Sequence, residues 1–261
     1  MRIFLILLVC ALSGVSCDKL FKLQEKVKTT ESASTSANNE DQETDVDKKY
    51  TGTRIQNYPN GKIKSSVQYV DGRRNGEAKN FYENGNLKFL THYENGKKQG
   101  TTFYYYQDGK VYRESHYVDD KLDGLRKVYN SSGRVMAEMP YKNGYPGKGL
   151  QEFLLNGNPR TKFPSLQIRT IDDRSTSGLC HLEMSFSEMN PKDEFYVGTL
   201  LEGKYLHENL DVVNTSGGIG RITFNVPTGA YVNRKLNIIG VHMTKLGCQY
   251  VTTREYTVVV E

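Results

Sequence analysis

Side chains that could do chemistry are present in this chain, but their spacing matches no catalytic or metal-binding pattern. Serine, histidine and aspartate all occur, yet no Gly-x-Ser-x-Gly sequence is present to hold a serine nucleophile on a sharp turn. The glycine-rich stretch 217–220 is followed by no helical pattern, so it predicts a turn rather than a phosphate-binding loop. His92 and His116 could meet on a sheet as metal ligands, but Gln68 and Pro140 occupy the positions 24 residues before and after them. We therefore predict no catalytic residue, no metal ligand and no cofactor.

The N-terminus carries a pattern typical of export. Arg2 precedes the apolar run 3–12 and small residues follow it, which together predict a signal peptide over residues 1–16. The sequence Gly14-Val15-Ser16-Cys17 resembles the lipobox of bacterial lipoproteins, although glycine stands where leucine is commonest. This resemblance implies that Cys17 is lipidated and becomes the new N-terminus. The alternative is ordinary secretion, with Cys17 merely near the cleavage site.

Residues 17–50 are predicted to form a disordered linker. The segment is rich in Lys, Glu, Ser, Thr, Asn and Asp, and it has almost no apolar residue after Leu23. Such a composition cannot bury enough surface to offset the chain entropy that is lost on folding. The segment would therefore act as a flexible tether between the anchor and the folded part.

Cys180 and Cys248 remain in the exported part of the chain. An oxidising compartment permits a disulfide between them, which would stabilise the fold by about 4 kcal/mol through the entropy of the unfolded chain. Two buried thiols are the alternative, and the sequence leaves both open. Zinc is not indicated, because there is no CxxC motif and no pair of histidines beside either cysteine.

Residues 51–159 repeat with a period of 24 residues. Four kinds of side chain return at this spacing: a turn glycine, an aliphatic residue, a tyrosine and a second aromatic residue. The columns are Gly61, Gly85, Gly109, Gly133 and Gly157; Ile63, Leu87, Val111 and Val135; Tyr69, Tyr93, Tyr117 and Tyr141; and Phe81, Tyr105, Tyr129 and Phe153. Such a period indicates a repeat architecture with one supersecondary unit per repeat.

Each repeat is predicted to contain two strands and two tight turns. Asn84-Gly85 and Asn95-Gly96 are typical of two-residue hairpin turns, in which both residues have positive φ. Residues alternate in polarity between these turns, as in a strand with one buried face. Stacking the units gives an antiparallel meander of about nine strands. Gly76, Gly100 and Gly124 lie on the second strands, where the missing side chain leaves room for an aromatic ring from the next strand.

The repeat resembles a known family. The order Tyr-x-Asn-Gly-Lys, an aliphatic residue, a strand ending in Tyr, x-Asn-Gly, then Gly and a Tyr- or Phe-rich strand is similar to the MORN repeat (membrane occupation and recognition nexus) over residues 51–159. The nearest form is the 24-residue bacterial variant of a family described as toxin–antitoxin antitoxins. The resemblance implies a twisted open sheet that docks proteins, assembles oligomers or binds phospholipid. An antitoxin normally acts in the cytoplasm, whereas this chain carries an export pattern.

Residues 160–261 are predicted to form a second domain, because the period stops at Arg160 and short apolar runs bounded by turn residues replace it. The runs cover residues 166–171, 179–186, 194–201, 219–226, 236–243 and 250–260, with a weaker one over 204–213. Strands at this spacing, without a helical pattern, suggest an antiparallel sandwich of immunoglobulin-like size. The predicted fold class is all-β: an open antiparallel meander of MORN-type hairpin repeats followed by an immunoglobulin-like β-sandwich.

The candidate binding surface consists of aromatic residues on the second strands and at the turns that follow them: Phe81, Tyr82, Tyr104, Tyr105, Tyr106, Tyr129 and Phe153. Large exposed aromatic rows are typical of interfaces. The alternative is that the rings only hold the stacked strands together. Residues 51–160 also contain 18 Lys and Arg against 11 Asp and Glu. This excess can attract acidic lipid headgroups or anionic glycans, or it can simply keep an exposed sheet soluble.

These patterns predict a non-enzymatic exported lipoprotein whose repeat sheet docks a protein partner at the bacterial cell envelope, on the outer membrane or the periplasmic face. The lipid anchor would supply the membrane contact, and export argues against nucleic acid as a partner. Two copies could pair through the first strand, near residues 53–58. The alternatives are a module that binds glycan, cell wall or phospholipid, and an antitoxin or immunity protein. Aromatic wall-binding repeats usually rely on Trp, which this chain lacks.

Overall fold

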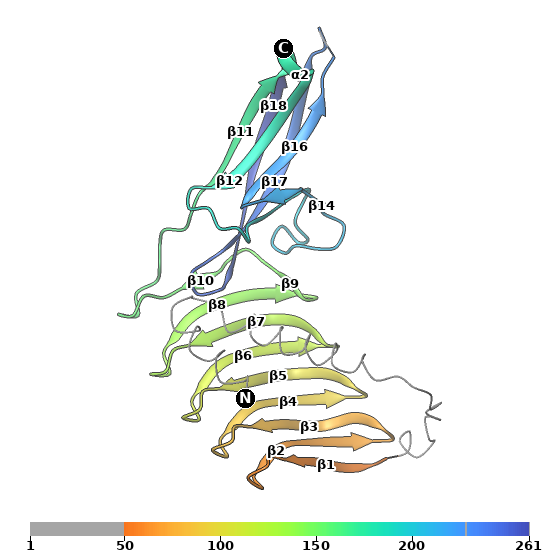
Figure 1. Ribbon diagram of the computed structural model, residues 1–261, viewed down its shortest axis with the longest axis vertical. Coiled ribbons are helices and arrows are strands. Elements are labelled where there is room, and N and C mark those ends of the chain that lie inside the picture. Colours follow the sequence, from red (N-terminus) through yellow and green to blue (C-terminus); the bar gives the residue numbers. More distant parts are fainter. Residues whose placement is uncertain (1–49, 228, 261) are drawn as a thin grey trace, which may run out of the picture. The chain divides into compact units, whose positions relative to one another are not determined.

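The computed structural model describes residues 50–227 and 229–260, and most of these residues lie in strands (Figure 1). The predicted signal peptide, Cys17 and the linker up to residue 49 lie outside the described residues. Within the described part, the one helix is the short α2 (Arg174–Ser177). No helix of that part is long and apolar enough to cross a membrane.

The repeats form a single antiparallel meander, as predicted. Its strands follow the chain order, with β1 at one edge, and both β9 and β10 pair with β8 at the other. Figure 1 shows β1 to β8 stacked one after another. The bounds are β1 (Gly52–Asn57), β2 (Ile63–Val70), β3 (Arg73–Phe81), β4 (Leu87–Glu94), β5 (Lys97–Tyr105), β6 (Val111–Val118), β7 (Lys121–Tyr129), β8 (Val135–Lys142), β9 (Tyr145–Pro146) and β10 (Gln151–Glu152).

The two turns of each repeat differ in geometry. In the second turns both central residues have positive φ, as predicted; Asn95 has 50° and Gly96 has 88°. The prediction was wrong for the first turns, where the glycine has positive φ (97° at Gly85) but the residue before it does not. The side-chain oxygen of Asn84 instead accepts the N–H of Asn86 at 2.9 Å. This local bond stabilises a longer loop, since a side chain that caps its own turn does not need the left-handed conformation.

A β-bulge with a glycine recurs within each repeat. Between the pairs Leu90↔Phe103 and His92↔Gln99, three residues of β5 face one residue of β4. Gly100 lies inside this bulge with φ 72°, and it is paired with a tyrosine of the following strand. The same arrangement gives the cross-strand pairs Gly76↔Tyr93, Gly100↔Tyr117 and Gly124↔Tyr141. The glycines are thus paired in register with the tyrosines, but the predicted ring over each glycine is not found: the space beside Gly76 is taken by Gln68 and that beside Gly124 by His116, and nothing lies within 4 Å at Gly100. Each bulge increases the local twist of the sheet.

The C-terminal residues form two antiparallel four-stranded sheets. One has the order β11-β12-β16-β15 and the other β14-β13-β17-β18. This matches the A-B-E-D and C′-C-F-G sheets of an immunoglobulin-like sandwich. The bounds are β11 (Leu166–Asp173), β12 (Leu179–Phe186), β13 (Glu194–Val197), β14 (Asp211–Val212), β15 (Thr215–Ser216), β16 (Ile219–Asn225), β17 (Val232–Met243) and β18 (Gln249–Val260).

A common core holds the two C-terminal sheets together. Leu182 and Phe186 of β12 pack in one cluster with Phe195 of β13, Ile238 of β17 and Val258 of β18, and none of these side chains is more than 1% exposed. Alternate residues of both sheets thus point inward, as a sandwich requires. In the glycine-rich stretch 217–220, Gly217 and Gly218 form the predicted tight turn between β15 and β16, and the next two residues begin β16.

In the part of the chain that the structure describes, Cys180 and Cys248 are both buried and no disulfide joins them. Cys180 belongs to the sandwich core, whereas Cys248 lies in a separate cluster with Met139 and Tyr141 of β8. The disulfide alternative is therefore wrong and the alternative of two buried thiols holds. A disulfide needs Cα atoms about 4.4–6.8 Å apart, which two residues of separate clusters do not offer.

The last strands of the meander contact the turn between β17 and β18. The described residues 50–227 and 229–260 belong to one compact unit, so the repeats and the sandwich are continuous in contact. Glu152 of β10 is 2% exposed and its Oε1 accepts the hydroxyl of Thr244 at 2.5 Å, while Oε2 lies 2.9 Å from Arg160. Phe163 and Tyr250 stack nearby with centroids 4.5 Å apart. The domain boundary between residues 159 and 160 stays a prediction.

Candidate binding surface of the repeat sheet

The register divides the predicted aromatic surface into three groups. Residues paired across antiparallel strands point to the same side, and neighbours along a strand point to opposite sides. Tyr104 therefore lies on one face of the sheet and Tyr105 on the other. Tyr82 and Tyr106 stand at the first turns. Phe81, Tyr129 and Phe153 occupy the same position of the 24-residue period as Tyr105. All seven side chains are half-buried.

The turn tyrosines link one repeat to the next. The hydroxyl of Tyr82 donates to the carbonyl of Tyr105 at 2.6 Å, and that of Tyr106 donates to the carbonyl of Tyr129 at 2.8 Å. Tyr58 makes the same bond to Phe81 one repeat earlier. The polar ends of Tyr82 and Tyr106 therefore serve cohesion, which is the alternative that the sequence left open for these rings.

Replacing Tyr106 with phenylalanine should lower the free energy of unfolding by about 1 kcal/mol, because the carbonyl of Tyr129 loses a partly buried donor. Urea denaturation measures the change. Tyr231→Phe is the matched control, since its side chain is 61% exposed and the same atom is removed. A loss no larger than in this control would contradict the role of the hydroxyl ladder.

Tyr104 belongs to what we call the tyrosine–cation face. The Tyr69, Tyr93, Tyr117 and Tyr141 column lies on this side, and each of its rings carries one cation. The distances from cation to ring centroid are 5.1 Å for Arg54 and Tyr69, 5.2 Å for Arg74 and Tyr93, 5.3 Å for Lys98 and Tyr117, and 4.8 Å for Arg126 and Tyr141. Arg113 lies 4.1 Å from the Tyr104 centroid. A guanidinium stacked on a ring contacts it through its flat side.

Burial and the neighbouring Tyr117 raise the pKa of Tyr104 above its usual value.

Between the ring row and the turns, small side chains fill the middle of the same face. Thr91 and Thr102 are at most 1% exposed and their hydroxyls lie 2.5 Å apart. Sheet residues this small let the larger Tyr and Arg side chains lie over them, which buries the centre of a single-layer sheet.

The opposite face carries the column of Tyr105 and Tyr129 together with paired charges. Lys127 lies 3.6 Å from both Glu114 and Glu138, which flank it on the neighbouring strands. Burial, together with the nearby carboxylates of Glu114 and Glu138, raises the pKa of Tyr129 to about 12. The phenol is thus held in its neutral, hydrogen-bonding form, and its side chain is not part of the hydroxyl ladder.

Other polar groups that the sequence offered do not assemble into reactive sites. His92 and His116 stand on separate strands of the opposite face, with His92 3.8 Å from Glu94 and His116 3.4 Å from Thr101. Among residues 50–227 and 229–260, no group of three or more His, Cys, Asp or Glu side chains could hold a metal ion.

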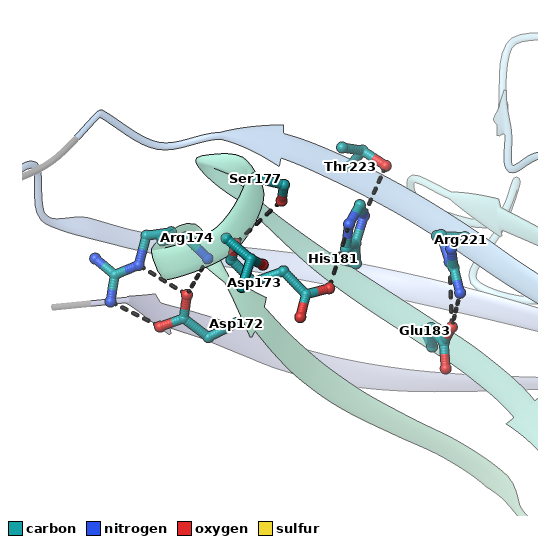
Figure 2. A network of polar contacts seen from close by, with 9 residues as sticks. Asp172, Asp173, Arg174, Ser177, His181, Glu183, Arg221 and Thr223 are labelled. Atoms are coloured by element: carbon teal, nitrogen blue, oxygen red, sulfur yellow. Dashed lines mark hydrogen bonds and ion pairs between the residues drawn. The ribbon is translucent and has the colours of Figure 1, made fainter.

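A polar network that the sequence did not reveal lies on the outer side of the β11-β12-β16 sheet (Figure 2). His181 lies 3.0 Å from the hydroxyl of Thr223 and 3.7 Å from the carboxylate of Asp173. This order resembles a nucleophile, a base and an orienting acid, but 3.7 Å is an ion-pair distance and not a hydrogen bond that fixes a catalytic imidazole.

Beside it, the 6%-exposed Glu183 binds Arg221 and Arg169, and these bonds lower its pKa. The network therefore orders the surface of the sheet. Each group is satisfied by a neighbour on the next strand, since the register pairs Arg169, Glu183 and Arg221 in one row.

Comparison with known families identifies the repeats. Four consecutive segments match the MORN repeat variant: residues 50–71, 74–95, 98–119 and 122–143. The chain carries four MORN-type repeats. Among curated proteins, none matches the chain. Each matched segment covers two paired strands and the loop between them. The four segments correspond to β1–β2, β3–β4, β5–β6 and β7–β8, so the sheet described above is built from these repeats. Repeats of this kind indicate a binding scaffold, because a stacked sheet presents the same side chains at regular intervals.

Proposed function

We propose that this protein is a non-enzymatic exported lipoprotein whose repeat sheet docks a protein partner at the bacterial envelope, on the outer membrane or its periplasmic face. The signal-like residues 1–16 and the lipobox-like Cys17 support export and anchoring. The four MORN-type repeats support a docking role. In this arrangement residues 17–50 give the sheet reach from the membrane, and the sandwich covers the end of the meander that follows β8.

The observation that carries the docking role is the aromatic column of the opposite face. Phe81, Tyr105, Tyr129 and Phe153 return once per repeat and stay half-exposed. Tyr105 and Tyr129 contribute only their backbone carbonyls to the hydroxyl ladder. Their partly exposed rings recur at intervals of two strands, and aromatic rings within a polar rim are typical of interfaces.

A crosslinking pull-down from envelope membranes tests the proposal, with wild type compared with the double variant Tyr105→Ser/Tyr129→Ser. We expect wild type to capture a partner that the variant loses. The control is Tyr82→Phe/Tyr106→Phe, which weakens the ladder and leaves the aromatic column in place. Capture of the same proteins by all three would contradict docking through this column. Retention on peptidoglycan or on phospholipid vesicles, without a protein partner, would favour the binding modules that the sequence left as alternatives.

The anchor is tested separately with Cys17→Ala. The variant is expected to leave the membrane fraction and to appear in the soluble envelope fraction, because one acylated residue would be the membrane attachment. A variant that stays with the membranes would contradict lipidation of Cys17 without bearing on the docking surface.

A further inference from the structure

One edge strand of the C-terminal sandwich stops short. β15 pairs with only the first two residues of β16, and just beyond them the N–H of Arg221 donates to the carbonyl of Asn214 at 3.0 Å. In the described part of the chain, no further strand pairs with β16 on that side. Backbone groups alternate in direction along a strand, so those of Thr223 and Asn225 point the same way as those of Arg221. They form an open edge that an added strand could pair with.

This open edge carries none of the usual protection. Exposed strand edges are normally blunted by Lys, by Pro or by a bulge. The stretch 222–225 has no charged residue and no proline, and its register with β12 is unbroken. The corresponding stretch of β17 differs, because it carries Arg234 and Lys235. Of the two edges, that of β16 is therefore the one suited to pairing.

A cavity of about 330 Å³ lies beside this edge and is lined by both sheets. Ile222 and Phe224 of β16 line it, and Val197 of β13 and Leu236 of β17 line it from the other sheet. All four side chains are in contact with the common core, and the first three are only half-buried. Residues that pair across strands point to the same side. An added strand would therefore direct every second side chain into this cavity.

The charged residues of the cavity mark its two ends. Asp211 of β14 pairs with Val197 of β13, so it stands at the end where these two strands meet. Arg234 stands at the other end, near the start of β17 and toward the loop that joins β16 to β17. The third charge in the lining is Arg221, which is already bound to the carboxylate of Glu183.

Arg234 is the cation that a ligand in the cavity would meet. It is exposed, and none of the ion pairs of the described residues includes it. Its neighbour Lys235 differs, since it lies 2.8 Å from Glu255 of β18. A cation without an acid beside an apolar wall favours a ligand with an acidic side chain at this end, and Asp211 disfavours a second acid at the other.

We propose that the open edge of β16 binds an extended peptide segment as an added antiparallel strand, with an acidic residue two positions before an apolar one. Strand addition of this kind takes its affinity from backbone bonds and its specificity from alternate side chains. The direction follows from β12 and β15, which are both antiparallel to β16. The acidic side chain faces Arg234, the apolar one lies between Ile222 and Leu236, and the residue between them exchanges backbone hydrogen bonds with Thr223. This inference goes beyond the proposed function, because it concerns the sandwich and not the repeat sheet.

The first test compares three synthetic peptides on the wild-type protein, with affinity measured by fluorescence anisotropy. Ser-Thr-Glu-Thr-Val-Thr-Ser has the proposed order, Ser-Thr-Val-Thr-Glu-Thr-Ser is the same sequence reversed, and the third peptide has Gln in place of Glu in the first. We expect the first peptide to bind about tenfold more tightly than the reversed one and about fivefold more tightly than the Gln peptide. Equal affinity for the first two peptides would overturn the proposal.

The second test asks whether the peptide binds through its backbone. N-methylation of the central threonine removes the N–H that faces Thr223 and should abolish binding of the first peptide. N-methylation of its valine is the matched control, because that N–H points away from β16, and should change the affinity less than threefold. Hydrogen exchange at Thr223 and Asn225 should slow when the peptide binds. Equal losses from the two methyl groups, or slowed exchange at Asn233 and Lys235 instead, would overturn pairing with β16.

The third test places the acidic side chain of the peptide. Arg234→Gln should weaken binding of the first peptide about fivefold, whereas the control Lys235→Gln, which removes a neighbouring cation, should change the affinity less than twofold. Arg234→Glu should reverse the preference, so that a peptide with Lys in place of Glu binds more tightly than the Glu peptide. Circular dichroism checks that each variant is folded. Equal losses in the two Gln variants would overturn the role of Arg234.

A second copy of the chain is the competing occupant of an open strand edge. Sedimentation analysis of the wild-type protein distinguishes the two occupants. A monomer at the concentrations of the peptide test supports an open edge, whereas a dimer that the first peptide dissociates would overturn a peptide as the natural occupant. The Tyr105→Ser/Tyr129→Ser variant should bind the peptide as wild type does. Its loss of a captured partner and a failure of peptide binding are therefore separate results.

Discussion

Replacing Asp193 with alanine is expected to lower the free energy of unfolding by about 3–5 kcal/mol. The carboxylate has no exposed side-chain surface. It accepts the N–H of Asn190 at 2.9 Å and the N–H of Met243 at 3.2 Å. Nδ1 of His242 lies 2.9 Å from its Oδ1, at a charge-contact distance but without the alignment of a hydrogen bond. Alanine would leave two backbone donors buried without their acceptor and would remove the carboxylate beside the buried imidazole, and buried donors without a partner are costly.

Two variants make this prediction specific. Asp193→Asn keeps an acceptor oxygen of the same size and should lose less than alanine does. Asp172→Ala is the control on the same sandwich, where an exposed carboxylate binds only Arg174, and it should change stability much less than Asp193→Ala does. Urea unfolding followed by circular dichroism measures all three. A loss below 1 kcal/mol for Asp193→Ala would mean that water replaces the carboxylate.

The meander could be predicted from the sequence because its period is visible in single residue types. Glycine at the turns and tyrosine on the first strands recur every 24 residues, and the register pairs Gly100 with Tyr117 as the pattern indicates. The first turns were mispredicted because Asn-Gly fits two loop geometries, and the choice depends on whether the Asn84 side chain caps the loop. Strand parity was available in the sequence as well: adjacent Tyr104 and Tyr105 must point to opposite faces.

The cations of the tyrosine–cation face could not be read from the period. Arg74 and Lys98 share one position of the repeat, but Leu122 stands at the next. Arg126, from another position of the period, places its guanidinium over Tyr141 instead. Long side chains reach the same ring from two places on the strand, so the structure keeps a cation at each tyrosine although the sequence columns do not.

The separation of Cys180 from Cys248 likewise depends on packing between distant segments, which the spacing of cysteines does not encode.

The contact between the meander and the sandwich includes one buried carboxylate, Glu152, and its removal is the second change with a large expected effect. Glu152→Ala should lower the free energy of unfolding by about 3 kcal/mol, because Arg160 and the buried hydroxyl of Thr244 both lose their partner. Thr244 also accepts the N–H of Cys248 at 3.2 Å, so the turn between β17 and β18 is held from both sides. Gln151→Ala, the exposed neighbour on β10, is the control and should have little effect.

Differential scanning calorimetry shows what this contact does for the whole unit. If Glu152 couples the repeats to the sandwich, wild type unfolds in one cooperative transition, and Glu152→Ala separates it into two. Two transitions already present in wild type would contradict the coupling and support independent domains that meet near residue 160. A single, unshifted transition in the variant would show that the apolar contacts around Cys248 are enough to couple the repeats to the sandwich. Coupling matters for binding, because a meander held at one end by the sandwich keeps its rows of side chains in a fixed register for a partner.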